Sequence, residues 1–501
     1  MNTFKRKALM SAVLAGLGVA GTAEAVYQNP NGLGQALIYP YYTVQATSGN
    51  AFNTYVSVVN TTDRAMVVKV RFREGRNSRE VLDFNLYLSP NDVFTGAVIP
   101  ASADAAAPGR FVTADVSCTN PAIPATGVDF RNFEYVGAAA DGAGTGLDRT
   151  REGYVEMIEM AVLNAPDSTR VTHVNGVPPN CAAVQGQIVT FATAFSSPVG
   201  GLAGTGTLIN VNSGLDMTYN AVAIADLTAA PIYANIGTDV PNLGDADPVS
   251  VVVSRNATGT DTNAYTSGWL DVVTTPLTVT DGAQAVSATM MHSSVINEYV
   301  LDSGSLSNSD WVMTMPTKRY FVNLATAVQP FTEKFTATGA CEEIGFTFFN
   351  REEQGASATS VDFSPLPPGA APNTLCWEST VLSLRNGAAH MPATTNSGVL
   401  GSVNNTNVQV NTAYQNGWGR LTFTDTNASG IGMVSDPATS ITFTVFPAPA
   451  IVGGAQTYRG LPVVGFMVRT FNNSTLTCGT ASCQGNYGGL FGHSYEQNIL
   501  P

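Results

Sequence analysis

The chain has 501 residues and a formal net charge of −14, with 37 acidic against 23 basic side chains. This acidic balance argues against nucleic acid, whose phosphates require a basic binding surface, and against an anionic membrane surface. Only 12% of the residues are charged and 48 are glycine, a composition typical of a β-rich extracellular protein with many loops.

Residues 1–25 have the pattern of a secretory signal peptide. A basic start at Lys5–Lys7 precedes the apolar run Ala8–Ala20, and Ala23–Ala25 fits the small-x-small cleavage pattern. The apolar run is short for a bilayer span, so we expect no transmembrane anchor beyond the cleaved peptide. Cleavage before Val26 removes three positive charges and one glutamate, which changes the net charge from −14 to −16. We therefore expect an exported protein at the cell surface or in the extracellular space, with the periplasm as the alternative.

Two apolar runs contain a proline: the first is expected at a sheet edge or sheet entry, and the second at a sheet edge or a bulge. They are Tyr39–Val44, with Pro40, and Trp311–Val322, with Pro316. Proline cannot donate a hydrogen bond to a neighbouring strand, which confines it to edges and bulges. An exposed edge of this kind can accept a strand from a second molecule.

Residues 51–100 predict a β-hairpin with a fixed register. Met66–Phe72 and Leu82–Leu88 each alternate apolar and polar residues, so each strand has one apolar face. A slip by one residue would move every apolar side chain to the wet face, so a turn centred on Asn77 specifies the pairing strongly. The register pairs Phe72 with Leu82, Val70 with Phe84, Val68 with Leu86, Met66 with Leu88 and Arg71 with Asp83.

Four segments carry a resemblance to known proteins. VVNTTDRAMVVKV (58–70) and LYLSPNDVF (86–94) resemble bacterial immunoglobulin-like domains, in which one strand ends at an Asn-Thr turn and a later one at a Pro-Asx corner. IYPYYTV (38–44) and DWVMTMPTKRYFV (310–322) resemble segments of uncharacterised exported proteobacterial surface proteins, which implies no established function. With many short strands separated by turn residues, the expected fold is all-β, with one or two immunoglobulin-like antiparallel β-sandwich domains and long loops.

The strand-like runs divide the chain into four parts. The signal peptide covers 1–25, and an N-terminal β-sandwich domain is expected over 26–225. Residues 226–330 have the composition of a polar linker with bridging strands, and a C-terminal β-sandwich domain is expected over 331–501. No amphipathic helix of substantial length is predicted in any part.

Six cysteines in an exported chain indicate disulfide bonds. None lies in a Cys-x-x-Cys motif, so the spacing favours neither a redox site nor a typical zinc site. Sequential pairing is expected because each pair of neighbours brackets a loop-rich stretch. The expected bonds are Cys118–Cys181, Cys341–Cys376 and Cys478–Cys483.

No group of residues has the spacing of a catalytic site. The chain lacks a Gly-x-Ser-x-Gly motif. A glycosidase needs two facing carboxylates, whereas adjacent residues of a strand point to opposite faces. We therefore expect loop or surface histidines, solvated glutamates and no enzymatic activity. The residues considered are His173, His292, His390 and His493, and the pairs Glu156/Glu159, Glu342/Glu343 and Glu352/Glu353.

The clearest metal-ligand pattern is Asp425-Thr-Asn427-Ala-Ser429-Gly430, with Asp436 at position twelve. Oxygen ligands at positions one, three, five and twelve suit Ca²⁺, and glycine at position six permits the sharp turn. However, position eight is glycine, position twelve is aspartate instead of glutamate, and strands instead of helices are expected on both sides. The segment is either a calcium site or a polar hairpin loop, and calcium is the one cofactor that the sequence suggests.

Lys69, Arg71 and Arg73 lie on one face of a predicted strand and form a basic patch in an acidic protein. Such a patch can bind an anionic surface glycan or an acidic partner strand. Glu80 and Asp83 on the neighbouring strand can neutralise part of the charge. We expect a solvated face, with glycan binding as the alternative.

Two hypotheses about function follow. The first is an exported non-enzymatic cell-surface or extracellular protein with a structural, adhesive or self-assembly role. The alternative is a secreted carbohydrate-binding or carbohydrate-cleaving protein. The expected partners are a second copy of the chain or a surface glycan. The carbohydrate hypothesis requires exposed aromatic side chains, and the candidates are Trp269, Trp311, Trp377 and Trp418.

Overall fold

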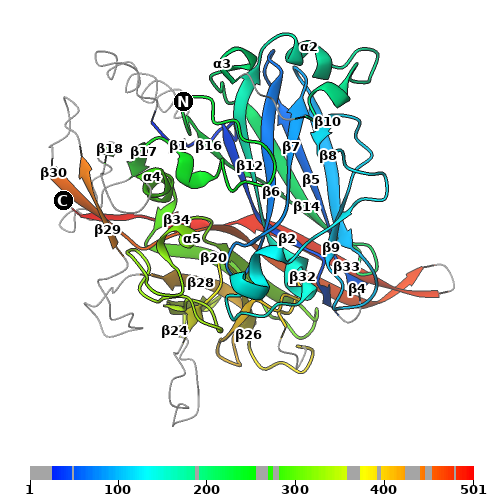
Figure 1. Ribbon diagram of the computed structural model, residues 1–501. Helices are drawn as coiled ribbons and strands as arrows, with labels where there is room; N and C mark the ends of the chain where they lie inside the picture. The colour runs from blue at the N-terminus through cyan, green and yellow to red at the C-terminus, as the bar shows by residue number, and fades with distance from the viewer. Residues whose placement is uncertain are drawn as a thin grey trace, which may run out of the picture.

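The structure is a computed structural model, and Figure 1 shows its arrangement. The fold is all-β and built mainly from antiparallel sheets, as the sequence predicts; β26 and β27 form a parallel pair. Among the described residues, no helix has the length and apolar character needed to cross a membrane. The structure describes residues 25–47, 50–186, 191–254, 269–274, 281–357, 373–391, 396–423, 440–445, 454–478 and 481–500.

An eight-stranded and a six-stranded sheet enclose the first hydrophobic core. Phe72 and Phe84 of the larger sheet contact Phe111 and Phe94 of the smaller one, with ring centroids 5.2 and 6.2 Å apart. The larger sheet has the order β1 (Tyr27–Gln28), β16 (Val222–Ala225), β2 (Ala36–Thr43), β12 (Glu152–Leu163), β6 (Met66–Glu74), β7 (Glu80–Leu88) and β10 (Cys118–Asn120), and β13 (Phe195–Ser196) pairs with β12. The smaller sheet has the order β11 (Val128–Asp129), β9 (Gly109–Val112), β8 (Val93–Pro100), β5 (Asn53–Asn60), β14 (Leu202–Asn210) and β15 (Leu215–Asn220).

The register predicted for the hairpin of β6 and β7 is confirmed. Phe72 lies opposite Leu82, Met66 opposite Leu88 and Arg71 opposite Asp83, as do the two intervening apolar pairs. The turn contains a residue in the left-handed region, Ser78, with φ of 50°. The period-two pattern sufficed here because one face of this hairpin is apolar and packs into the first core.

Two five-stranded sheets enclose the second core, and one of them also contributes to the first core. Val312 and Phe466 project into the first core, whereas Trp311 and Met467 project into the second. Alternation of side chains lets this shared sheet serve both cores. It has the order β27 (Asn405–Gln409), β26 (Ser379–Arg385), β21 (Asn308–Thr314), β32 (Val464–Cys478) and β33 (Ala481–Gly492). The other, which we call the outer sheet, has the order β24 (Gly355–Ser357), β23 (Gly345–Asn350), β28 (Asn416–Thr422), β20 (Ser294–Val300) and β34 (Ser494–Glu496).

The expected domain boundaries at 225 and 330 stay a prediction. The shared sheet takes β21 from the expected linker and its other four strands from the expected C-terminal domain. Its contribution to both cores joins the two halves of the chain through side-chain packing.

A further sheet, three two-strand pairs and several short helices complete the described fold. The sheet has the order β17 (Val249–Ser254), β18 (Trp269–Thr274), β29 (Ser440–Val445), β30 (Gly454–Arg459) and β35 (Asn498–Leu500). The pairs are β3 (Ala46–Thr47) with β4 (Asn50–Ala51), β19 (Met291–His292) with β31 (Leu461–Pro462), and β22 (Glu342–Glu343) with β25 (Thr374–Leu375). The helices are α2 (Asp167–Val171), α3 (Phe191–Ala194), α4 (Asp281–Met290) and α5 (Lys318–Phe321), with 3-10 turns η1 (Phe133–Tyr135), η2 (Gly137–Ala139), η3 (Leu147–Arg151), η4 (Cys181–Ala183) and η5 (Leu243–Asp245).

The helix α4 was not predicted from the sequence. Residues 282–290 are all buried, so the helix has no face exposed to solvent, and its short run of small residues does not give the long apolar stripe by which a helix is predicted. Its polar groups are satisfied internally: the hydroxyl of Ser287 donates to the carbonyl of Ala283 at 2.6 Å. A Cβ atom on Gly282 would lie 2.3 Å from the carbonyl oxygen of Ala246, so glycine lets the start of α4 lie against the chain that follows η5.

The expectation that Tyr39–Val44 and Trp311–Val322 form sheet edges is wrong. β2 lies between β16 and β12, and β21 lies between β26 and β32. The pairing of β2 with β12 shifts register between Tyr39 and Tyr42, so Pro40 lies in a bulge. Pro316 follows the end of β21 and interrupts no pairing. Neither run offers a free edge for strand addition.

Substitution of Trp311 tests how much the second core contributes to the stability of the fold. Its side chain is fully buried, and its indole N–H donates to the carbonyl of Glu298 at 3.1 Å. We expect Trp311→Ala to lower the free energy of unfolding by about 3–5 kcal/mol, because it leaves a cavity. The measurement is urea unfolding followed by circular dichroism. Phe133→Ala is the control, since that ring is 74% exposed, and equal midpoints for the two variants would contradict the assignment.

Candidate functional site

The predicted basic patch is not a solvated face. The side chains of Lys69, Arg71 and Arg73 have no exposed surface. Lys69 pairs with Asp83 at 3.0 Å, and Arg71 pairs with Glu80 at 2.5 Å. Arg71 thus lies opposite Asp83 in the register, as predicted, yet its ion pair is with the neighbouring carboxylate.

Residues 227–247 cover this patch, and we call them the strap. The guanidinium of Arg71 donates to the carbonyls of Pro241 and Thr238 at 2.6 and 3.0 Å. Arg73 reaches Asp239 at 3.0 Å, and Asp239 also pairs with Arg319 at 2.7 Å. The sequence indicated a polar linker here because the strap is polar and rich in proline. The strap leaves no accessible surface at which Lys69, Arg71 and Arg73 bind a glycan.

A second buried polar network joins the halves of the chain. The carboxylate of Glu152 accepts a hydrogen bond from Tyr41 at 2.6 Å and from Ser402 at 2.5 Å, together with the backbone N–H groups of Val403 and Asn404. Charge-assisted hydrogen bonds of this kind are among the stronger ones. Glu152 therefore fixes the 402–404 segment against the first core.

Three of the glutamates expected in solvent are buried. Glu156 pairs with Arg73 at 2.9 Å, and Glu342 accepts hydrogen bonds from residues 332 and 333. Glu159 accepts the backbone N–H groups of Val199 and Gly200, and burial raises its pKa to about 7. Each carboxylate is held by protein groups, so the burial is compatible with a structural role. Glu343, Glu352 and Glu353 are exposed, as expected.

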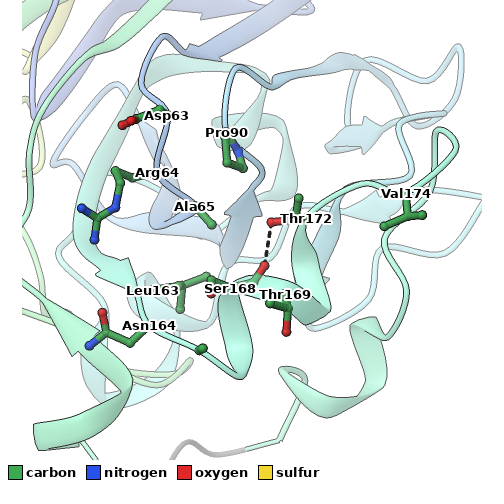
Figure 2. A pocket seen from close by; sticks show the side chains of 11 residues that line it. Asp63, Arg64, Ala65, Pro90, Leu163, Asn164, Ser168, Thr169, Thr172 and Val174 are labelled. Atoms are coloured by element: carbon green, nitrogen blue, oxygen red, sulfur yellow. Dashed lines mark hydrogen bonds between the residues drawn. The ribbon is translucent and has the colours of Figure 1, made fainter.

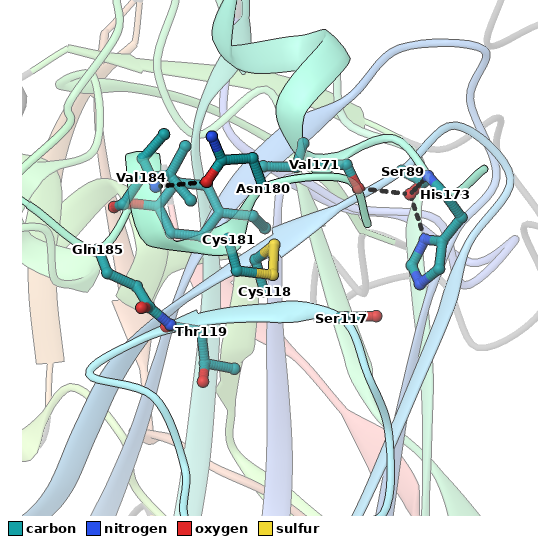
Figure 3. Close-up of a disulfide and its surroundings, with 12 residues drawn as sticks. Ser89, Ser117, Cys118, Thr119, Val171, His173, Asn180, Cys181, Val184 and Gln185 are labelled. Carbon is teal, nitrogen blue, oxygen red and sulfur yellow. Dashed lines mark hydrogen bonds between the residues drawn. A yellow bond between two sulfur atoms is a disulfide. The ribbon is translucent and has the colours of Figure 1, made fainter. Parts of the chain in front are cut away.

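Two of the predicted disulfides are present, Cys118–Cys181 and Cys341–Cys376. Figure 3 shows the first, which ties β10 to η4 beside Ser89 and His173. Next to it the side chain of Gln185 donates to the carbonyl of Thr119 at 3.1 Å, so polar contacts reinforce the covalent bond.

The third pair and the calcium loop are not tested by the structure. Cys478 and Cys483 lie near the end of the hairpin of β32 and β33, but their side chains lie outside the described residues. The loop with Asp425, Asn427, Ser429 and Asp436 lies outside the described residues entirely. In the part of the chain that the structure describes, no three His, Cys, Asp or Glu side chains form a candidate metal site.

A pocket of about 460 Å³ lies at one end of the N-terminal sandwich, between the 63–65 turn and α2 (Figure 2). Several of its hydroxyl groups bond to the backbone: Thr172 donates to the carbonyl of Ser168, and Thr169 to that of Pro166. The amide oxygen of Asn164 accepts from Ser196. These groups stabilise α2 and its neighbours, and we assign no ligand to the pocket.

The four tryptophans differ in exposure. Trp311 is buried in the second core, and Trp377 is partly buried beneath the guanidinium of Arg76, which lies 5.5 Å from the ring centroid. Trp418 is 37% exposed on the outer sheet. The side chain of Trp269 lies outside the described residues. Trp418 is therefore the one predicted aromatic candidate that the structure places at the surface.

The clearest candidate for an interaction site is the distal part of the hairpin of β32 and β33. Pairing of β32 with β21 ends at Thr470, but pairing with β33 continues to Cys478 and Ala481. We call residues 471–478 and 481–487 the ribbon, and Figure 1 shows it projecting from the molecule. At its base the N–H of Asn472 donates to Ser305. Within the described structure no further strand pairs with the ribbon. Its base is covered in part, since a Cβ atom on Gly214 in the turn between β14 and β15 would lie 4.0 Å from the carbonyl oxygen of Asn486, so the free edges lie toward the tip.

The ribbon has an uncharged, proline-free composition, which it shares with residues 393–419. No Asp, Glu, Lys, Arg or Pro occurs between Arg469 and Glu496. Side chains of these types are the usual protection of edge strands against pairing with other chains. Sequence reasoning missed the ribbon, because its many small polar residues lack the apolar alternation that identifies a strand.

Comparisons with known proteins do not identify the chain. No family model matches it, and no curated protein and no solved structure matches it significantly.

The ion pair of Arg73 and Glu156 should be important for stability. Both side chains are buried, so Arg73→Met leaves an unpaired buried carboxylate. We expect a loss of about 3–5 kcal/mol in the free energy of unfolding, measured with urea. In the control Arg110→Met, the replaced side chain pairs with Asp129 at a partly exposed site, and the midpoint should stay near that of the unmodified protein. A small effect of Arg73→Met would contradict the buried network.

Two buried histidines should make the fold sensitive to acid. His292 and His493 were expected at the surface, but burial lowers the pKa of His292 to about 3 and that of His493 to about 4. The unfolded chain, with histidine pKa near 6.5, binds these protons first as the pH falls. Stability is therefore lost progressively below about pH 6.5.

His292→Phe tests this acid sensitivity. The substitution keeps an aromatic ring against Tyr495, which lies 4.0 Å from the His292 ring. Between pH 7 and 4.5 we expect the variant to lose about 2–3 kcal/mol less stability than the unmodified protein. Urea titrations at both pH values provide the measurement, and equal losses for the two proteins would show that His292 is not responsible.

Proposed function

We propose that the chain is an exported, non-enzymatic surface or extracellular protein with a structural role, and that it self-associates through the ribbon. The observation that carries the proposal is an uncharged, proline-free β-ribbon whose edges have no partner strand in the described structure. The signal-peptide pattern and two disulfides support export, since disulfides persist in oxidising compartments.

A free strand edge carries a row of backbone N–H and C=O groups that a second strand can pair with. Two-stranded ribbons are marginally stable alone in water, so an additional strand stabilises them. Pairing through the backbone needs little from side chains, which suits a segment composed largely of Asn, Ser, Thr and Gly.

The charge distribution favours a second copy of the chain as the partner. The whole chain carries a net charge of −14, so two copies repel each other over most of their surfaces. The ribbon contains no ionised side chain, and the repulsion is smallest where two ribbons meet. Antiparallel pairing of β33 with β33 of the second copy produces a two-fold symmetric interface, the commonest arrangement of homodimers.

The test uses Tyr487→Lys, because Tyr487 lies on the edge strand β33 and is 63% exposed, so lysine does not disturb the core. Light scattering coupled to size-exclusion chromatography measures the mass over a hundredfold range of concentration. The unmodified protein should form dimers or larger species at high concentration, and Tyr487→Lys should shift this association at least tenfold higher.

Val116→Lys is the matched control, since Val116 is 51% exposed and lies in a loop far from the ribbon in sequence. It should associate like the unmodified protein. A monomer at every concentration would refute the proposal, and equal weakening by both lysines would place the interface elsewhere or assign the effect to net charge.

A further inference from the structure

The outer sheet presents an aromatic row on the face that points away from the second core. The row consists of two aromatic residues and a glutamate that lie side by side in the register of the sheet: Phe349 on β23, Trp418 on β28 and Glu298 on β20. The rings of Phe349 and Trp418 are stacked, with centroids 4.6 Å apart and planes at 16°. Trp418 keeps 37% of its surface exposed. An indole in this position offers apolar area and a polar N–H to a ligand from solvent.

The backbone beneath Trp418 is tightly packed. A Cβ atom on Gly419 would lie 2.4 Å from the ring of Phe346, and one on Gly417 would lie 1.8 Å from the carbonyl oxygen of Phe349. Gly419 therefore lets β28 lie close against the second core, and Gly417 lets it lie close against β23. Trp418 is therefore presented on a rigid, regular strand, and little ordering is needed when a ligand binds.

The charges around the row balance. Glu298 pairs with Arg469 at 3.1 Å, and Arg420 pairs with Glu496 at 3.0 Å. Arg469 also lies over the ring of Phe491, 4.4 Å from its centroid. These two guanidinium groups and two carboxylates carry no net charge. The turn after β23 adds Arg351, Glu352 and Glu353, so this part of an acidic protein is within one charge of neutral. The four side chains of the pairs with Glu298 and Glu496 are at least partly exposed, so they can exchange hydrogen bonds with a polar ligand without a large desolvation cost.

We propose that this surface binds a neutral hexose polymer, with Trp418 as the principal contact. Phe349 covers one face of the Trp418 indole, so a pyranose ring packs its C–H groups against the part of the indole that stays exposed. The carboxylate of Glu298 accepts hydrogen bonds from sugar hydroxyls, and the guanidinium of Arg420 donates to them. An anionic polymer would bring its charges close to Glu298 and Glu496, and a cationic one would compete with the existing ion pairs. The balanced charges therefore favour an uncharged saccharide.

This inference does not depend on self-association through the ribbon. The aromatic row lies on the outer sheet, whereas the ribbon belongs to the shared sheet. The variant Tyr487→Lys, which is designed to block association, should keep saccharide binding. The two proposals can therefore fail separately.

The experiment measures binding of the full mature chain to two neutral glucans. The protein is sedimented with microcrystalline cellulose, and soluble amylose is titrated while tryptophan fluorescence is recorded. Binding to at least one glucan is expected. Trp418→Ala should weaken it at least tenfold, and Trp418→Phe, which keeps a ring, should weaken it less.

Phe133→Ala is the matched control, because Phe133 is an exposed aromatic residue on η1, outside the outer sheet. It should bind like the unmodified protein, and thermal melting should show that all three variants are folded. Absence of binding to both glucans overturns the proposal, as does unchanged binding by folded Trp418→Ala. Stronger binding to the anionic polymer alginate than to either glucan would overturn the assignment to an uncharged saccharide.

Discussion

The need to neutralise buried guanidinium groups governs much of this fold. Arg71 and Arg73 project from the face of β6 that points away from the first core, and neither has exposed surface. A buried cation without partners is strongly unfavourable, so acceptors must come from elsewhere in the chain. β7 and β12 supply carboxylates, and the strap supplies two carbonyls and Asp239. The strap is thus positioned by the charges that it covers.

The same principle acts within the N-terminal half and between the two halves of the chain. Arg149 lies between Glu74 and Asp141, with ion pairs of 2.7 Å to each. Burial alone would raise the pKa of Asp141, but hydrogen bonds from Arg149 and Asn77 lower it to about 2. In the second polar network, Glu152 orders the 402–404 segment. Hydrogen bonds of fixed geometry therefore complement the apolar contacts of the shared sheet, and they specify one relative position of the two cores.

Sequence patterns predicted features that depend on neighbouring residues. The register of β6 and β7 follows from period-two alternation around one turn, and sequential pairing predicted two disulfides correctly. The patterns could not show that Lys69, Arg71 and Arg73 are buried, because the strap that covers them lies more than 150 residues further along the chain. Helix α4 was not predicted because it is buried on every side. The prediction of a sheet edge at Pro40 was wrong because a bulge accommodates this proline in an inner strand. Of the surface candidates, Trp418 was named from the sequence, but its partners Phe349 and Glu298 depend on strand order.

The shared sheet also constrains the order in which the protein can fold as it is synthesised. A chain that emerges from its N-terminus presents both sheets of the first core by residue 225, yet this core also includes Phe466 and Val468. Until those residues arrive, part of its apolar surface stays exposed to water or to a chaperone. Completion of the N-terminal sandwich therefore waits for nearly the whole polypeptide. Long multidomain chains commonly fold one domain after another as they are synthesised. Here the first core cannot be completed in that way, because it needs Phe466 and Val468 from the end of the chain.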